Sequence, residues 1–146
     1  MRLEFQIVPR EEVRADFPAF RPYLAEIREK TKARWVPEDI FGEISNNTAF
    51  LFRIVEEESG KEIGITVARL DVERHSGTKI MLAYLANVDF WDDSEEPNQF
   101  VQFYDDIAKK AGCDVIQFVS PRAGWAKKKT GCKLVACVFE REVPRG

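Results

Sequence analysis

The side chains most often used for nucleophilic catalysis and metal binding are scarce in this sequence. It contains three cysteines, Cys113, Cys132 and Cys137, and one histidine, His75. No two cysteines have the C-x-x-C spacing of a zinc ribbon or a thioredoxin-like site, so we expect no metal site. An odd number of cysteines favours reduced thiols over a disulfide framework. His75 lies in a segment typical of a hairpin turn, which favours a solvated imidazole over a catalytic one.

Two segments in the second half of the chain carry charges of one sign only. Residues 89–106 hold seven acids and no base, whereas residues 121–133 hold five bases and no acid. Two solvated faces would explain this pattern, and so would a dipolar surface that binds a charged partner or ligand. A nucleic-acid-binding module built on the basic segment is a further hypothesis. The net charge of −3 argues against that module, so we expect no nucleic-acid partner.

Length and composition indicate one globular domain that spans residues 1–146. Hydrophobic residues make up 45% of the chain and charged residues 32%, a balance typical of folded domains. No segment approaches the roughly 20 apolar residues of a membrane-spanning helix. Glu4 interrupts the apolar stretch that a signal peptide would need. We therefore expect a soluble protein in the cytoplasm, without a membrane partner.

Hydrophobic periodicity and turn residues predict the element order β-α-α-β-β-β-α-β-α-β, an α/β (α+β) arrangement. Pro18 and Pro22 fall in the first turns of the first helix, where proline is tolerated. Gly112 is a natural end for the third helix. The expected strands are 3–8, 49–55, 63–72, 80–88, 115–119 and 134–143. The expected helices lie around 20–27, at 37–46, 100–111 and 121–130.

This element order, at this length, resembles the GNAT superfamily of N-acetyltransferases. The segment 113–125, followed by Gly131-Cys132, is also similar to the GNAT-like proteins of tailed bacteriophages. The resemblance implies one GNAT-like domain with a mixed, mostly antiparallel, twisted sheet of about six strands, flanked by about four helices. It further implies that the fourth and fifth strands splay apart and that acetyl-CoA lies between them. The phage likeness adds the virion as an alternative location to the cytoplasm.

The phosphate-binding turn of the family follows the fourth strand and has the pattern [RQ]-x-x-G-x-[GA]. Its glycines let backbone N–H groups approach the diphosphate of CoA. The matching residues 90–99 contain no glycine and no base, but four carboxylates. Like charges at this distance would oppose phosphate binding, so either acetyl-CoA is bound in another way or the fold is kept without the cofactor. The candidate cofactor-binding residues are Phe90, Trp91, Ser94, Arg122 and Trp125.

The catalytic positions implied by the resemblance also depart from the family pattern. Where many members carry a tyrosine that protonates the leaving thiolate, this chain has Lys127. Lysine, with an ordinary pKa of about 10, is a weak acid at neutral pH. Asp89 ends the fourth strand, where it would either act as a general base or simply begin the acidic segment. We also expect Arg122 to pair with Asp89, Asp92 or Asp93 and so to close the cofactor route.

Two hypotheses from different classes remain open on the sequence alone. The first is a phage-type N-acetyltransferase that transfers an acetyl group from acetyl-CoA to a small amine or a protein. The second is a catalytically degenerate protein of the same fold that acts in virion or head assembly, or binds a host or phage protein. The element order favours the first hypothesis, and the acidic replacement of the phosphate-binding turn favours the second.

Overall fold

A five-stranded mixed sheet forms the centre of the computed structural model, which describes residues 2–88, 96–119 and 131–145. The strands follow one another across the sheet in chain order. Consecutive strands pair antiparallel from the first to the fourth, and the fifth pairs parallel with the fourth. The expected mixed, mostly antiparallel sheet is therefore confirmed. The strands are β1 (Leu3–Val8), β2 (Phe50–Glu56), β3 (Glu62–Val72), β4 (Lys79–Val88) and β5 (Val115–Phe118).

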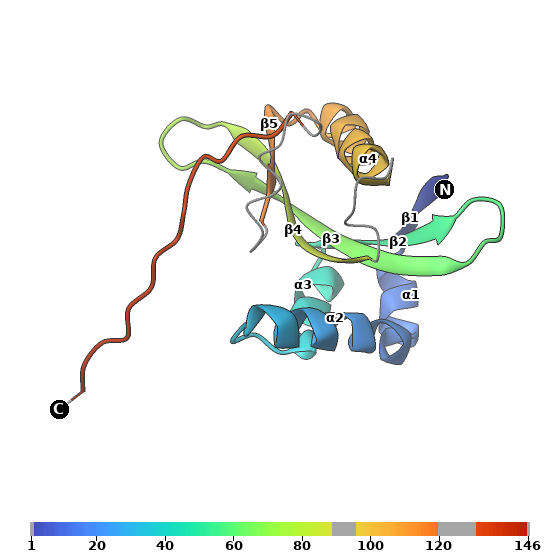
Figure 1. Ribbon diagram of the computed structural model, residues 1–146, viewed down its shortest axis with the longest axis horizontal. Helices are drawn as coiled ribbons and strands as arrows, with labels where there is room; N and C mark the ends of the chain where they lie inside the picture. The colour runs from blue at the N-terminus through green and yellow to red at the C-terminus, as the bar shows by residue number, and fades with distance from the viewer. Residues whose placement is uncertain (1, 89–95, 120–130, 146) are drawn as a thin grey trace.

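Helices cover both faces of the sheet (Figure 1). One face carries α1 (Arg10–Ala15), α2 (Phe17–Thr31) and α3 (Pro37–Ser45), and the other carries α4 (Glu96–Lys110). Each face has its own apolar core, because helices and strands bury their apolar sides against each other. In the described part of the chain, no helix is long and apolar enough to cross a membrane. The first core is centred on Phe20, Leu24, Leu51, Ile65 and Val67, and the second on Ile54, Met81, Phe100 and Tyr104.

The helical region before β2 contains one more helix than the periodicity indicated. The chain leaves the helical conformation at Asp16, which separates α1 from α2. Pro18 lies in the first turn of α2, where no N–H is needed. Pro22 lies in the second turn, so the carbonyl of Pro18 receives no backbone N–H from that position. The short α1 escaped prediction because six residues offer too few turns for a periodic pattern.

Two helix ends behave as their residue types predict. The carboxylate of Asp39 accepts a hydrogen bond of 2.8 Å from the backbone N–H of Val36 and so satisfies a donor at the start of α3. Gly112, with φ +72°, follows α4 in the left-handed conformation that glycine adopts without steric cost. The next residue donates its N–H to the carbonyl of Ala108, which closes the helix.

The last expected strand is absent from the part of the chain that the structure describes. Residues 132–145 are extended but form no strand, so the prediction of a strand at 134–143 was wrong for this chain on its own. Figure 1 shows the C-terminal segment running away from the sheet. β-Branched and aromatic residues favour the β-strand conformation, but a segment rich in them forms a strand only where a neighbouring strand completes its hydrogen bonds.

Candidate active site

β4 and β5 separate halfway along β4. Their parallel pairing ends at Ala83 of β4 and Phe118 of β5. One further hydrogen bond, of 3.1 Å, runs from the N–H of Val119 to the carbonyl of Ala83. β4 nevertheless continues to Val88, paired with β3 on its other side. Among the described residues, 84–88 therefore have a strand neighbour on the β3 side only. We call these five residues the open half of β4.

A β-bulge marks the point of separation. Ala83 pairs with Ala68 of β3, whereas Leu85 pairs with the adjacent Val67, so Tyr84 is an extra residue on β4. Ala83 belongs to the core under α4, and Leu85 belongs to the core under α1–α3. The bulge thus shifts the alternation of side chains along β4 by one residue, so that odd-numbered positions lie on one face of the sheet before it and on the other face after it. Bulges are common beside active sites because they redirect a side chain and end strand pairing.

Polar side chains from α2 and α3 reach the open half of β4. The hydroxyl of Tyr84 donates a hydrogen bond of 2.5 Å to Oε2 of Glu43 in α3. The amide nitrogen of Asn87 donates to the backbone carbonyl of Tyr23 at 3.1 Å and to Oε2 of Glu26 at 3.2 Å, both in α2. Two carboxylates, Glu26 and Glu43, therefore contact this half of the strand from the same face of the sheet.

The two carboxylate contacts differ in their electrostatics. Hydrogen bonds from Lys30 and then Asn87 hold the pKa of Glu26 below its ordinary value, so this side chain stays ionised. Burial, and next the hydrogen bond to Glu43, raise the pKa of Tyr84, so its phenol stays protonated. The guanidinium of Arg69 lies 5.1 Å from the centre of the Tyr84 ring. Glu26 thus places a negative charge beside the open half of β4, where Lys30 pairs with it at 2.7 Å.

All three tyrosines of the chain are expected to resist ionisation while the protein is folded. Burial raises the pKa of Tyr23 to about 12, and it also raises the pKa of Tyr84 and Tyr104. In the unfolded chain, the tyrosines have their ordinary pKa of 10.0. The protonated phenols therefore stabilise the folded state fully below pH 10.0, and this contribution is lost as the pH rises through the pKa values of the folded protein.

An alkaline titration checks this expectation. Tyrosinate absorbance should show no step near pH 10 while circular dichroism still reports the folded state, and the phenols should ionise together with unfolding. A phenol that titrated near pH 10 in the folded protein would contradict the burial on which the pKa shifts depend.

The residues predicted for the site lie outside the described residues. β4 ends at Val88, and the described chain continues one residue past β5, to Val119. Because the two strands are parallel, their carboxyl ends point towards the same edge of the sheet. The pairing of Arg122 with an acid stays a prediction. His75 lies in the turn between β3 and β4 and is exposed, as expected. The residues outside the description are Asp89, Phe90, Trp91, Asp92, Asp93, Ser94, Arg122, Trp125 and Lys127.

Sequence reasoning missed the polar residues that contact the open half of β4. Asn87 offered a signal, because it is a polar residue within an otherwise apolar strand. Tyr84 gave no sign that it occupies a bulge. Glu26 and Glu43 resemble ordinary surface acids of an amphipathic helix, since their role depends on which strand the helix faces.

No family model and no curated protein matches this chain, but solved structures do. An aminoglycoside acetyltransferase from an uncultured soil metagenomic sample, with a TM-score of 0.66 at 13% identity, matches over 97% of this chain and 97% of its own. A ribosomal-protein-alanine N-acetyltransferase from Brucella melitensis biovar Abortus matches over 98% and 99%, with a TM-score of 0.65 at 11% identity. A GNAT family acetyltransferase of Staphylococcus aureus matches over 98% and 100%, with a TM-score of 0.63 at 11% identity. The chain therefore has the GNAT fold along nearly its whole length.

Proposed function

We propose that this GNAT-fold chain is an N-acetyltransferase that uses acetyl-CoA and a cationic amine acceptor. The observation that carries the proposal is the separation of β4 from β5 at Ala83, beside the bulge at Tyr84. It leaves a strand edge open in a chain whose fold matches that of several acetyltransferases along nearly its whole length. Such an edge can take a linear ligand that carries amide groups, in the manner of an added strand.

The open half of β4 suits the amide-containing arm of acetyl-CoA. Its backbone N–H and C=O groups on the side away from β3 have no strand neighbour among the described residues. Such groups need hydrogen-bond partners, and the arm supplies both donors and acceptors. The phosphates of CoA require positive charge instead. The sequence offers it after β5, in the five bases between residues 121 and 133, rather than in the acidic turn after β4.

Each step of the proposed reaction can be assigned to residues of this chain. When bound, acetyl-CoA supplies a thioester carbonyl that an amine can attack. Glu26 and Glu43 would attract the protonated amine and hold it beside the open half of β4. Asp89, which directly follows β4 in the sequence, would take the amine proton directly or through a water molecule. Lys127 remains a candidate for protonating the leaving thiolate.

Neutralising the two carboxylates should weaken use of the amine without preventing acetyl-CoA binding. We expect Glu26→Gln with Glu43→Gln to lower kcat/KM for a cationic amine by about tenfold or more, because a hydrogen bond to a charged group contributes about 1.5–3 kcal/mol. Acetylation of a polyamine or aminoglycoside, measured by thiol release, provides the assay. Calorimetry with acetyl-CoA should give the same affinity for the variant and the unaltered protein.

Glu38→Gln is the matched control for this experiment. Glu38 lies in α3 like Glu43, but it pairs with Arg21 at 2.8 Å and its partner is not in β4. The Glu38→Gln variant should therefore have an unchanged kcat/KM. Equal losses in the control and the double variant would argue against a specific role for Glu26 and Glu43 in holding the amine.

A second candidate function is that of a binding protein without catalysis. The acidic, glycine-free turn at residues 90–99 supports it, because this sequence is poorly suited to a diphosphate. The phage likeness of segment 113–125 makes virion assembly, or binding to a host or phage protein, the corresponding role. A stable stoichiometric complex without any acetyl transfer would favour this alternative, and turnover by the isolated chain would remove it.

A further inference from the structure

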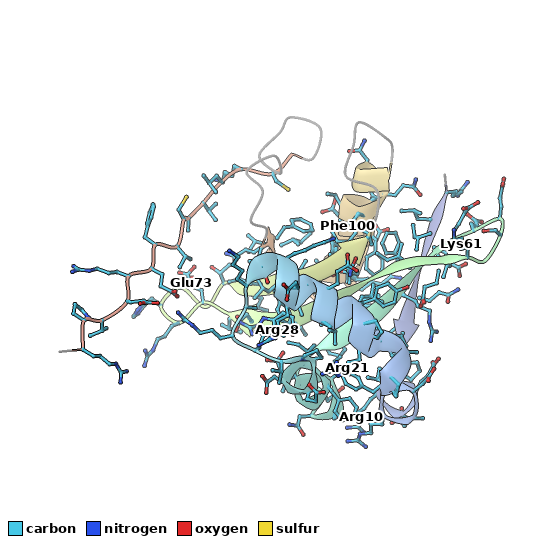
Figure 2. All side chains as sticks on the ribbon, turned by 60° about the horizontal axis from the view of Figure 1, so that its bottom comes forward. Arg10, Arg21, Arg28, Lys61, Glu73 and Phe100 are labelled. Atoms are coloured by element: carbon cyan, nitrogen blue, oxygen red, sulfur yellow. The ribbon has the colours of Figure 1, made fainter. Side chains whose placement is uncertain are left out.

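A hydrogen-bonded pair of hydroxyl groups lies in the core between the sheet and α4. Thr66 of β3 and Tyr104 of α4 are both completely buried, and their hydroxyl oxygens lie 2.6 Å apart. Phe100, about one turn before Tyr104 on the same side of α4, lies between that helix and the sheet (Figure 2). Among the described residues, Thr66 is the only buried side chain that is neither apolar nor aromatic. Valine and phenylalanine would fill the same space, so packing alone does not account for the two hydroxyls.

The pair acts on the backbone of β4 beside the bulge. Oγ1 of Thr66 donates a hydrogen bond of 3.0 Å to the carbonyl of Leu85, and the hydroxyl of Tyr104 donates to Thr66. Leu85 directly follows Tyr84, the extra residue of the bulge. A bulge disrupts the ladder of backbone hydrogen bonds locally. A side-chain donor at this point can therefore fix a carbonyl whose direction the ladder alone would not determine.

The direction of this carbonyl decides what the open half of β4 offers to a ligand. Thr66 belongs to β3, so its hydroxyl holds the carbonyl of Leu85 on the β3 side. The C=O and N–H groups of a trans peptide unit point in opposite directions, and the described chain contains no cis peptide bond. The N–H of Ala86 therefore points away from β3. On that side, the open half of β4 has no strand neighbour within the described part of the chain.

Tyr104 also contacts the other strand of the gap. Its ring lies 5.5 Å from the ring of Phe118, edge to face. Phe118 is the last residue of β5 that pairs with β4. One side chain of α4 thus contacts β5 where its pairing ends and, through Thr66, the backbone of β4 next to the bulge.

We infer that Thr66 and Tyr104 are positioning residues for the proposed acetyl-CoA site, because together they hold the N–H of Ala86 towards the gap between β4 and β5. This inference rests on the proposed function and gives neither residue a contact with the ligand. Replacing both partners of a buried hydrogen bond by apolar groups of the same shape costs little stability. The contribution of the pair should therefore appear in the local backbone and in acetyl-CoA affinity.

Two variants separate the hydroxyl from the packing of Thr66. Thr66→Val with Tyr104→Phe removes both hydroxyls and keeps the volume of the core. Circular dichroism should show a folded protein, and calorimetry should show acetyl-CoA binding weakened by about fivefold, the effect of one hydrogen bond. Thr66→Ser keeps the hydroxyl but loses a methyl group. It should lower Tm by roughly 1–6 °C and leave acetyl-CoA affinity unchanged.

The backbone amide resonances of residues 84–86, recorded without ligand, report directly on the bulge. The double variant should shift them more than Thr66→Ser does at the same positions. Ile54→Val is the matched control, because it removes a methyl group from the same core and leaves both hydroxyls in place. It should lower Tm by an amount similar to that of Thr66→Ser, without changing acetyl-CoA affinity or these resonances.

Unchanged resonances of residues 84–86 in the double variant would overturn the inference. An equal loss of affinity in Thr66→Ser would overturn it as well, because the hydroxyl would then not be the cause. If the unaltered chain did not bind acetyl-CoA, the proposed function would fail, and the effect on affinity with it. The resonances recorded without ligand would still decide whether the pair holds the bulge.

Discussion

Replacing Tyr104 with alanine should lower the free energy of unfolding by about 3–5 kcal/mol, the usual cost of truncating a buried aromatic side chain. Tyr104 is completely buried in the core between the sheet and α4. Its ring lies 5.2 Å from the rings of Phe100 and Phe103 and 5.5 Å from that of Phe118. Phe118 is the last residue of β5 that pairs with β4, so the cavity would also loosen the strands where they separate. Denaturant unfolding measures the loss.

Tyr104→Phe separates the contribution of the ring from that of the hydroxyl. Oγ1 of Thr66 donates to the carbonyl of Leu85 at 3.0 Å, so the hydroxyl of Tyr104, 2.6 Å away, must be the donor to Thr66. When the Tyr104 hydroxyl is removed, the Thr66 hydroxyl still donates to the carbonyl of Leu85, so no buried donor loses its acceptor. The phenylalanine variant should therefore lose only about 1 kcal/mol. A loss as large as that of the alanine variant would show that the hydroxyl, and not packing, dominates.

Replacing Gly64 with alanine should cost about 3 kcal/mol, at the upper end of the usual range for overpacking. A Cβ atom at this position would lie 2.1 Å from the backbone oxygen of Asn87 and 2.9 Å from Cα of Val88. Both contacts are with backbone atoms, so β3 and β4 would have to move apart. The movement would act on the open half of β4, and the variant should also bind acetyl-CoA more weakly. Thermal unfolding should show a fall in Tm of roughly 6–12 °C.

Gly42→Ala is the control for this change. Gly42 lies within α3, and nothing lies within 4 Å of the Cβ that alanine would add. The substitution should raise the free energy of unfolding by roughly 0.5–1 kcal/mol, because alanine is the better helix former. If both variants destabilised the protein equally, the close approach of β3 and β4 would not be the reason for glycine at position 64.

The strands and helices that the residue pattern predicted correctly are those with a strong local signal. β4 was recognised from its apolar character on both faces, and it is indeed covered by α2 on one side and α4 on the other. The end of α4 followed from Gly112 alone. In these cases the local preference and the final environment agree, so short-range reasoning is sufficient.

The features that escaped prediction depend on contacts between distant parts of the chain. The bulge at Tyr84 arises from the register between β3 and β4, which no single segment encodes. The contacts of Glu26 and Glu43 with β4 depend on how α2 and α3 pack on the sheet. The C-terminal segment has the composition of a strand but lacks a strand partner within the described chain, so its local preference was a poor guide.

Acetyl-CoA titrated into isotope-labelled protein, followed through the backbone amide resonances, tests the proposed gap between β4 and β5 most directly. The largest shifts should occur in residues 84–88 of β4 and at Val119 after β5, with smaller shifts in β1 and β2. Hydrogen exchange in the open half of β4 should also slow on binding, because the ligand would occupy its backbone groups. Absence of any shift in residues 84–88 at millimolar acetyl-CoA would contradict an acetyl-CoA site between the strands.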